Sequence, residues 1–147
     1  MSSVKDWFER SKGQWFSNRR YFYESSGKVQ LVDSDFTVDV RESKDKEFTV
    51  EIIWDSKGDV ESKGSMICEF DENKNLLYRN IGYMTKDPTF SFVSMIDEDT
   101  ILFRTEYDDM VFREEIRMID DNHRLRQTLG WKNNTVFLAG QYYERRK

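Results

Sequence analysis

The sequence contains one cysteine, Cys68, and one histidine, His123. A single cysteine cannot form an intrachain disulfide, which excludes a secreted scaffold held together by disulfides. Zinc sites are built mainly from cysteine and histidine, so the chain is poor in the ligands that such a site needs. We therefore predict no metal site, a buried structural role for Cys68 in a strand, and a solvated turn position for His123.

Other common signals are also missing. No segment approaches the roughly 20 apolar residues that span a bilayer, and the N-terminus lacks the pattern of a signal peptide. These absences predict an intracellular protein with no membrane partner. The chain has no glycine-rich phosphate loop, nucleophile elbow or dinucleotide fingerprint. Segment 71–75 begins like a calcium loop, but the glycine and final glutamate of such a loop are absent, which predicts a hairpin turn instead.

The composition indicates one globular domain. Of the 147 residues, 15% are aromatic and 35% are charged, which is typical of neither a disordered nor a fibrous protein. A chain of this length buries roughly 70% of its unfolded surface around one core. No linker or repeat divides it, so we predict a single domain over residues 1–147. The net charge of −5 argues against a nucleic-acid partner, because clustered lysine and arginine supply that affinity.

The hydrophobic pattern indicates one helix followed by strands. Val4, Trp7 and Phe8 share one face of a helix predicted at about 3–11. From about residue 14 to 146, apolar and polar residues mostly alternate with period two between turn-like breaks, which predicts about ten strands. Short turns make such strands an antiparallel meander, and closing the meander removes its exposed edges. We predict a mainly β fold, an up-and-down barrel that holds either packed side chains or one small ligand.

One carboxylate lies on the apolar face of a strand predicted within the stretch 105–128. That face is formed by Met110, Phe112, Ile116 and Met118. Glu114 has the same parity and points inward with them, whereas Glu115 lies on the mixed, solvated face. An inward carboxylate is costly unless a partner compensates its charge, so Glu114 favours a ligand cavity over a packed interior.

Two nearby arginines have two alternative orientations. Leu125 and Leu129 have the parity of a buried face. Hydrophobic alternation alone therefore predicts that Arg124 and Arg126 point to solvent. In the other register, both guanidinium groups point inward. They would then be bidentate partners for Glu114 or for the carboxylates of a ligand.

Three motifs near the C-terminal end carry a family resemblance. TEYDDM (105–110), REEI (113–116) and NHRLRQT (122–128) resemble the signature of the S-type phycobiliprotein lyases, the CpcS/CpeS type. FERSKGQWFSNR (8–19) and IGYM (81–84) extend the similarity over nearly the whole chain. The chain departs from the family pattern at Cys68, where an aromatic is common, and at Tyr143, where a serine precedes the glutamate.

The resemblance implies a ten-stranded barrel similar to lipocalins and fatty-acid-binding proteins, and a lyase activity. Such a lyase attaches phycoerythrobilin or phycocyanobilin through a thioether to a cysteine of a phycobiliprotein subunit. The client expected first is phycoerythrin, with phycocyanin or allophycocyanin as alternatives, and a homodimer is a further open alternative. The bilin is the substrate and no cofactor is expected. The compartment would be the cytoplasm of a cyanobacterium-like cell, or the plastid stroma of an alga.

The resemblance also implies that Arg124 and Arg126 point inward, and it indicates the site residues. Glu114 and Arg124 are the predicted catalytic residues. The predicted bilin-binding residues are Arg126, Trp15, Arg19, Trp54, Tyr107 and Thr128. We expect burial to raise the pKa of Glu114 toward general-acid use, unless an arginine holds it ionised. Two alternatives remain: a carrier of the fatty-acid-binding type with a structural Glu114, and a bilin chaperone that attaches nothing.

Overall fold

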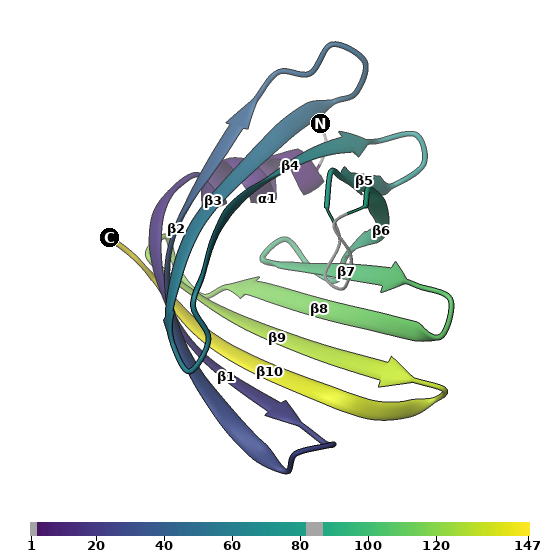
Figure 1. Ribbon diagram of the computed structural model, residues 1–147. Coiled ribbons are helices and arrows are strands. Elements are labelled where there is room, and N and C mark those ends of the chain that lie inside the picture. Colours follow the sequence, from purple (N-terminus) through teal and green to yellow (C-terminus); the bar gives the residue numbers. More distant parts are fainter. Residues whose placement is uncertain (1–2, 82–86) are drawn as a thin grey trace.

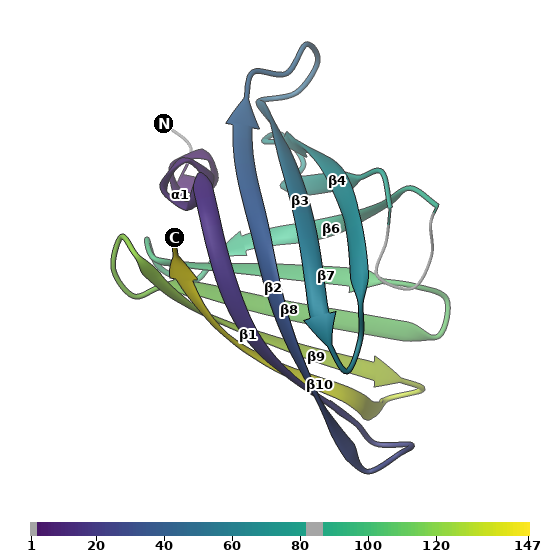
Figure 2. The same ribbon diagram turned by 60° about the vertical axis from the view of Figure 1, so that its left-hand side comes forward.

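The computed structural model describes residues 3–81 and 87–147, and in these ranges the chain forms one helix and ten strands (Figures 1 and 2). The elements are α1 (Ser3–Ser11), β1 (Gly13–Tyr23), β2 (Lys28–Arg41), β3 (Phe48–Gly58), β4 (Ser62–Asp71), β5 (Leu76–Arg79), β6 (Thr89–Met95), β7 (Thr100–Glu106), β8 (Met110–Met118), β9 (His123–Lys132) and β10 (Thr135–Arg146). Gly82 and Tyr83 of the family resemblance lie outside the described residues.

The strands form one closed antiparallel barrel. Each strand pairs with its neighbour in the chain, and β1 pairs with β10 to complete the ring. This arrangement confirms the predicted up-and-down barrel with a short N-terminal helix. Among the described residues, no helix is long and apolar enough to cross a bilayer.

Asparagines shape two of the hairpin turns. Asn133 and Asn134 have φ values of 50° and 66° and form the two-residue connection between β9 and β10. Between β4 and β5, the Oδ1 atom of Asp71 accepts the backbone N–H of Asn73 at 3.0 Å, and Asn75 has a φ of 54°. The segment that begins like a calcium loop is therefore a hairpin turn, as predicted.

On β2, β3 and β8, side-chain alternation gives the buried face correctly. Phe36, Val38 and Val40 on β2 are buried, as are Phe48 and Val50 on β3. On β8, Phe112, Ile116 and Met118 are also buried. Glu114 lies among them with 4% of its surface exposed, while Glu115 lies on the outer face and is half-buried. The inward carboxylate predicted from strand parity is therefore present.

The helix α1 closes one end of the barrel (Figure 2). Phe8 packs against Phe48 and Phe103, with ring centroids 5.4 and 6.1 Å apart. Trp7 is 1% exposed and donates its indole N–H to the carbonyl of Asp99 at 2.9 Å. This aromatic layer fills the end of the barrel that α1 covers, so the apolar core lies beneath α1. The rest of the barrel interior is available for a cavity.

Candidate functional site

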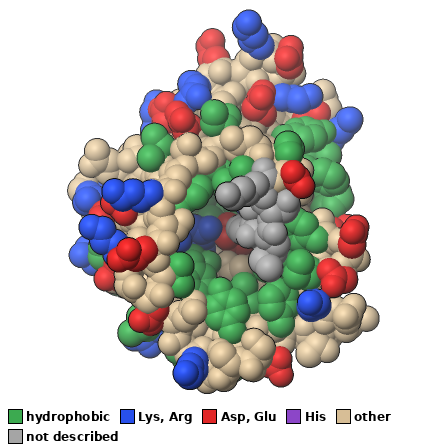
Figure 3. Space-filling view, in the orientation of Figure 1, with side chains coloured by type: hydrophobic (Ala, Val, Ile, Leu, Met, Phe, Trp, Pro, Cys, Tyr) green, Lys and Arg blue, Asp and Glu red, His purple; other side chains and the backbone are tan. Residues whose placement is uncertain are grey.

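The barrel interior contains a cavity of about 440 Å³, a volume within the range of small-molecule sites. Its lining extends from α1, at Trp7 and Ser11, to Tyr23 at the end of β1 and Val60 in the β3–β4 turn. In the space-filling view, hydrophobic side chains surround the hollow, and basic and acidic side chains are visible inside it (Figure 3). The cavity is therefore amphipathic, with charged groups on its walls.

Glu114 lies on the β8 wall of this cavity. Its Oε2 atom accepts a hydrogen bond of 2.7 Å from Nη2 of Arg126 and lies 3.3 Å from the Thr128 hydroxyl. Burial raises the pKa of Glu114, but the charges of Arg126 and Arg79 outweigh it and hold this pKa below its ordinary value. Glu114 is therefore a carboxylate at neutral pH. Of the two outcomes expected for this residue, the one in which an arginine holds it ionised applies, and the rise of its pKa toward general-acid use does not occur.

Arg124 and Glu144 form a second internal ion pair. Nε of Arg124 donates to Oε1 of Glu144 at 2.6 Å, and the two residues are 4% and 0% exposed. Burial raises the pKa of Glu144, but Arg124, Arg126 and Arg19 lower it more, so its pKa is below the usual value. Burial lowers the pKa of Arg124, although a guanidinium stays protonated at neutral pH. This pair fixes one wall of the cavity near α1.

Aromatic rings support the Arg124 guanidinium. Its Cζ atom lies 5.0 Å from the centroid of the Trp15 ring, 5.2 Å from Phe36 and 5.7 Å from Trp7. Stacking on ring faces stabilises a buried cation. Arg124 also donates to the Ser11 hydroxyl at 3.3 Å, which connects it to the helix. Arg124 is thus held rigidly from several sides.

Both arginines of β9 point inward, which decides between the two orientations that the sequence left open. The outward orientation inferred from hydrophobic alternation alone is wrong, because Arg124 is buried and Leu125 is 50% exposed. The Arg126 side chain is 18% exposed and lines the cavity. The inward orientation that the family resemblance implied is correct for both residues.

Most of the predicted site residues lie around this one cavity. Those that line it are Glu114, Arg124, Arg126, Thr128, Arg19 and Trp54. Trp15 is fully buried, donates its indole N–H to the carbonyl of Ser11 at 2.8 Å, and does not line the cavity. Tyr107, at the β7–β8 turn, packs edge-to-face on Phe112 and does not line it either. The structure therefore gives Trp15 a supporting position behind Arg124 rather than a surface for stacking.

Three residues with inward side chains were missed by the sequence reasoning: Arg79, Tyr142 and Glu144. Arg79 is 5% exposed, lines the cavity and stacks over Phe103 at 5.6 Å. Strand parity was the available signal, because Leu77 and Arg79 share one face of β5, and Leu138, Tyr142 and Glu144 share one face of β10. The same argument that singled out Glu114 applies to Glu144.

Cys68 lies in the cavity wall on β4, 1% exposed. Burial raises the pKa of its thiol to about 11, and Arg79 opposes this rise. The buried position in a strand agrees with the structural role predicted for this residue. His123 is the first residue of β9, next to the predicted turn and not in it. Its side chain is 41% exposed, as expected for a solvated residue, and its Nδ1 atom lies 2.9 Å from the carboxylate of Asp120.

The charges of the interior do not balance. Among the described residues in and directly behind the cavity wall, the guanidinium groups are those of Arg19, Arg79, Arg124 and Arg126, and the carboxylates are those of Glu114 and Glu144. The formal excess is therefore two positive charges. A cavity wall with more guanidinium groups than carboxylates favours an anionic ligand, and guanidinium groups fit carboxylates best.

A closed ten-stranded antiparallel barrel with a helix at one end, a cavity and ion-paired arginines inside is a lipocalin-like barrel. Comparison with known proteins gives the family. Residues 47–147 match the model of the CpeS-like protein family, and the chain belongs to that family. This result confirms the S-type phycobiliprotein lyase family that the motifs predicted.

Individual relatives agree over nearly the full chain. The "Putative phycocyanobilin lyase CpcS 2" of a Nostoc species is 29% identical over 99% of this chain and 91% of its own length. The chromophore lyase CpcS/CpeS 1 of Trichodesmium erythraeum is 27% identical over 86% of this chain and 87% of its own. The solved structure of the S-type phycobiliprotein lyase CPES from Guillardia theta has a TM-score of 0.81 at 21% identity, covering 99% and 93% of the two chains, and it shows the shared fold.

Proposed function

We propose that this protein is a bilin lyase that attaches phycoerythrobilin or phycocyanobilin through a thioether to a cysteine of a phycobiliprotein subunit. Family membership and the lyase names of the relatives support the activity. A phycoerythrin subunit is the client to test first, with phycocyanin and allophycocyanin subunits next. Such a client would place the protein in the cytoplasm of a cyanobacterium-like cell or in a plastid stroma.

The observation that carries this proposal is the excess of two positive charges around an ionised Glu114. A bilin has two propionates, and guanidinium groups of the cavity wall offer bidentate partners for carboxylates. The same pigment has pyrrole nitrogens that become cationic when protonated. The Glu114 carboxylate can accept hydrogen bonds from those nitrogens and stabilise their positive charge. One ligand therefore fits both kinds of charge in the cavity.

The chemistry is the addition of a thiol to a conjugated double bond. The client sulfur forms a bond to the ethylidene carbon of the bilin A ring, and the adjoining ring carbon gains a proton in place of the one that the thiol loses. No electron donor or acceptor is needed for this balance. The lyase contributes orientation of the reactants and exclusion of water from a reactive pigment. It also stabilises the protonated tetrapyrrole, whose positive charge makes the ethylidene carbon more electrophilic toward the sulfur. Glu114 is the residue proposed for this last role.

The charge count also bears on the two alternative functions. A carrier of one fatty acid would place one carboxylate among the four guanidinium groups, whereas a bilin would place two there. A bilin chaperone would use the same cavity, and only the client reaction distinguishes it from a lyase. The cavity alone therefore favours a dicarboxylate ligand, and the lyase step rests on the family.

A binding and transfer experiment tests the proposal. The purified protein is titrated with phycoerythrobilin and with phycocyanobilin, and we expect a changed and intensified long-wavelength absorption from an extended, protonated pigment. Addition of a client apoprotein should then give pigment that stays on the client in denaturing gels. Reversible binding without covalent transfer would indicate the chaperone. Binding of a fatty acid with no response to either bilin would indicate the carrier.

A further inference from the structure

A tyrosine separates two arginines on the cavity wall. In the strand register, Tyr142 of β10 lies directly between Arg19 of β1 and Arg126 of β9. The Cζ atom of Arg19 is 5.1 Å from the centroid of the Tyr142 ring, and that of Arg126 is 4.7 Å from it. Both guanidinium groups line the cavity. The ring thus contacts two cations that would otherwise face each other across one strand.

The position of the Tyr142 ring is closely determined. The residue is 7% exposed, and its ring packs edge-to-face on Tyr21 with centroids 5.5 Å apart. Its hydroxyl lies 3.3 Å from the hydroxyl of Thr128, which also contacts Glu114. Gly140 provides the space, because a Cβ atom there would lie 3.0 Å from Cε1 of Tyr142 and 3.3 Å from its hydroxyl.

Both arginines also lie near one carboxylate, that of Glu144, which is on β10 like Tyr142. Oε2 of Glu144 lies 4.0 Å from Nη2 of Arg19 and 3.9 Å from Nη1 of Arg126, distances at the limit of an ion pair. Glu144 makes its short contact with Arg124 instead, at 2.6 Å. Arg126 is also held by Glu114 at 2.7 Å, and Arg19 donates to the Ser17 hydroxyl at 3.1 Å. The Tyr142 ring is therefore the close contact that the two guanidinium groups share, and it lies between them.

We propose that Tyr142 is a positioning residue that holds the Arg19 and Arg126 guanidinium groups apart as two separate carboxylate anchors, and so makes the cavity selective for ligands with two carboxylates. Two like charges side by side repel, and a neutral ring with negative potential on its faces reduces that repulsion. Without the ring, the two side chains would move apart or turn to Glu144 together. The proposal rests on the bilin function for its natural ligand, but it concerns diacid selectivity and is testable with other diacids.

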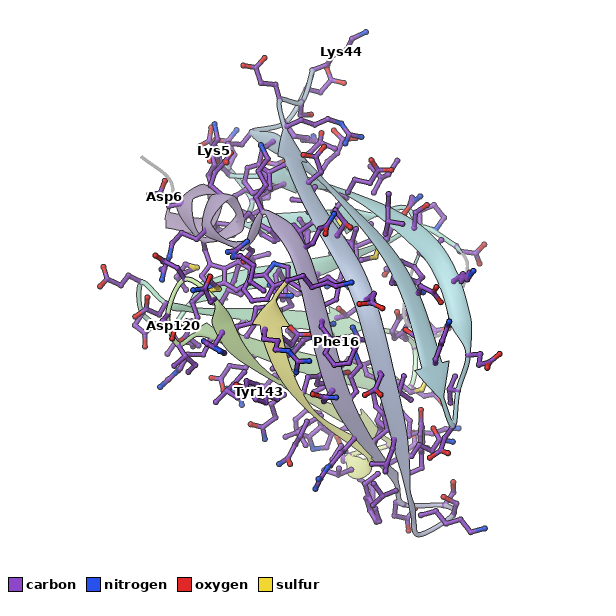
Figure 4. All side chains as sticks on the ribbon, turned by 90° about the vertical axis from the view of Figure 1, so that its left-hand side faces the viewer. Lys5, Asp6, Phe16, Lys44, Asp120 and Tyr143 are labelled. Atoms are coloured by element: carbon purple, nitrogen blue, oxygen red, sulfur yellow. The ribbon has the colours of Figure 1, made fainter. Side chains whose placement is uncertain are left out.

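The test compares Tyr142→Phe, which keeps the ring, with Tyr142→Leu and Tyr142→Met, which keep apolar volume but remove it. Tyr143→Leu is the matched control, because Tyr143 is the next residue, 50% exposed and on the outer face of β10 (Figure 4). For each variant, thermal unfolding is recorded, and Kd is measured for phycocyanobilin and for its dimethyl ester. The quantity of interest is the ratio of the two Kd values, which a merely structural loss would not change.

The parent should prefer the diacid by roughly tenfold or more, equivalent to about 1.4 kcal/mol. Tyr142→Phe and Tyr143→Leu should keep this ratio. The variants without the ring should lose most of it, with a nearly unchanged Kd for the ester. A parental ratio in a folded ring-less variant, or no diacid preference in the parent, would overturn the proposal. If Tyr142→Leu does not fold, the measurement is made on Tyr142→Met. If neither variant folds while Tyr142→Phe does, the ring has a structural role, and this result also overturns the proposal.

A second pair of ligands separates this inference from the bilin function. The same ratio is measured with a long-chain dicarboxylic acid and the monocarboxylic acid of equal length. A preference for the diacid that depends on the ring, without any binding of bilins, would support the role of Tyr142 and reject the bilin function. Normal bilin binding and transfer by a folded Tyr142→Leu variant, with the parental ratio, would reject the role of Tyr142 and leave the lyase proposal standing.

Discussion

Arg126 reaches diagonally across two strands to bind Glu114. In the register of β8 and β9, Glu114 lies opposite Thr128 and Arg126 lies opposite Ile116, and the hydrogen bond between Arg126 Nη2 and Glu114 Oε2 is 2.7 Å long. The pair holds Glu114 as a carboxylate inside the barrel. In the proposed function, Glu114 would therefore be a hydrogen-bond acceptor and counter-charge for the pigment, rather than a group that arrives with its own proton.

The pH dependence of stability tests this ionisation state. The folded pKa of Glu114 is lowered, so its contribution is complete above the unfolded value of about 4.3 and is lost as pH falls through the folded pKa. We expect the difference in unfolding free energy between the parent and Glu114→Gln to be constant from pH 8 to about 5 and to shrink only below that range. Urea unfolding of the apo proteins across pH measures it. A difference that grows as pH falls from 8 to 5 would mean that the folded pKa is raised.

The Arg124–Glu144 pair should contribute more to stability than exposed ion pairs do. Glu144→Gln leaves the buried Arg124 without its counter-charge, and we expect a loss of about 3–5 kcal/mol in unfolding free energy. The control is Glu51→Gln, which removes an ion pair with the exposed Arg41 at 3.2 Å and should cost about 1 kcal/mol or less. Chemical denaturation of both variants gives the comparison, and losses of similar size would contradict the burial argument.

Cys68 should take no covalent part in the reaction. Its thiol pKa of about 11 leaves roughly one thiolate in a thousand thiols at pH 8, so it is a poor nucleophile. Cys68→Ser should lose about 1–3 kcal/mol of stability because a hydroxyl replaces a thiol in the cavity wall, and it should still transfer bilin. A folded, pigment-binding Cys68→Ser protein that cannot transfer would show that the thiol is needed.

The fold was predictable because its signal is repeated in most strands. Alternation such as that of Phe36, Val38 and Val40 gives the inward face, and polar turns separate the strands. Closure of the barrel followed from the lack of any other way to cover the edges of a long meander. The asparagine turns could be located as breaks, but their two-residue geometry depends on positive φ angles that a composition argument does not give.

The site was harder to predict, because part of this barrel's interior is a cavity with charged walls and not an apolar core. Alternation on β9 placed Leu125 inside and Arg124 outside, and the structure has the opposite order because ion pairs occupy the interior. Glu144 was overlooked although it shares the inward face of Tyr142. Trp15 was predicted to contact the ligand, but its distance from the cavity is set by packing of α1, which no sequence pattern encodes.

The adjacent glutamates give the most direct test of the account, because Glu114 and Glu115 share their sequence context and face opposite sides of β8. Bilin transfer to a client subunit is measured for the parent, Glu114→Gln and Glu115→Gln. Glu114→Gln should still bind bilin, but without the intensified long-wavelength band. Because the counter-charge for the protonated pigment is lost, its transfer rate should fall by roughly 10²-fold or more. Glu115→Gln should stay within about twofold of the parent, as expected for a surface substitution. Equal losses in the two variants, or a larger loss for Glu115→Gln, would contradict the role of Glu114 as the carboxylate that serves the bound pigment.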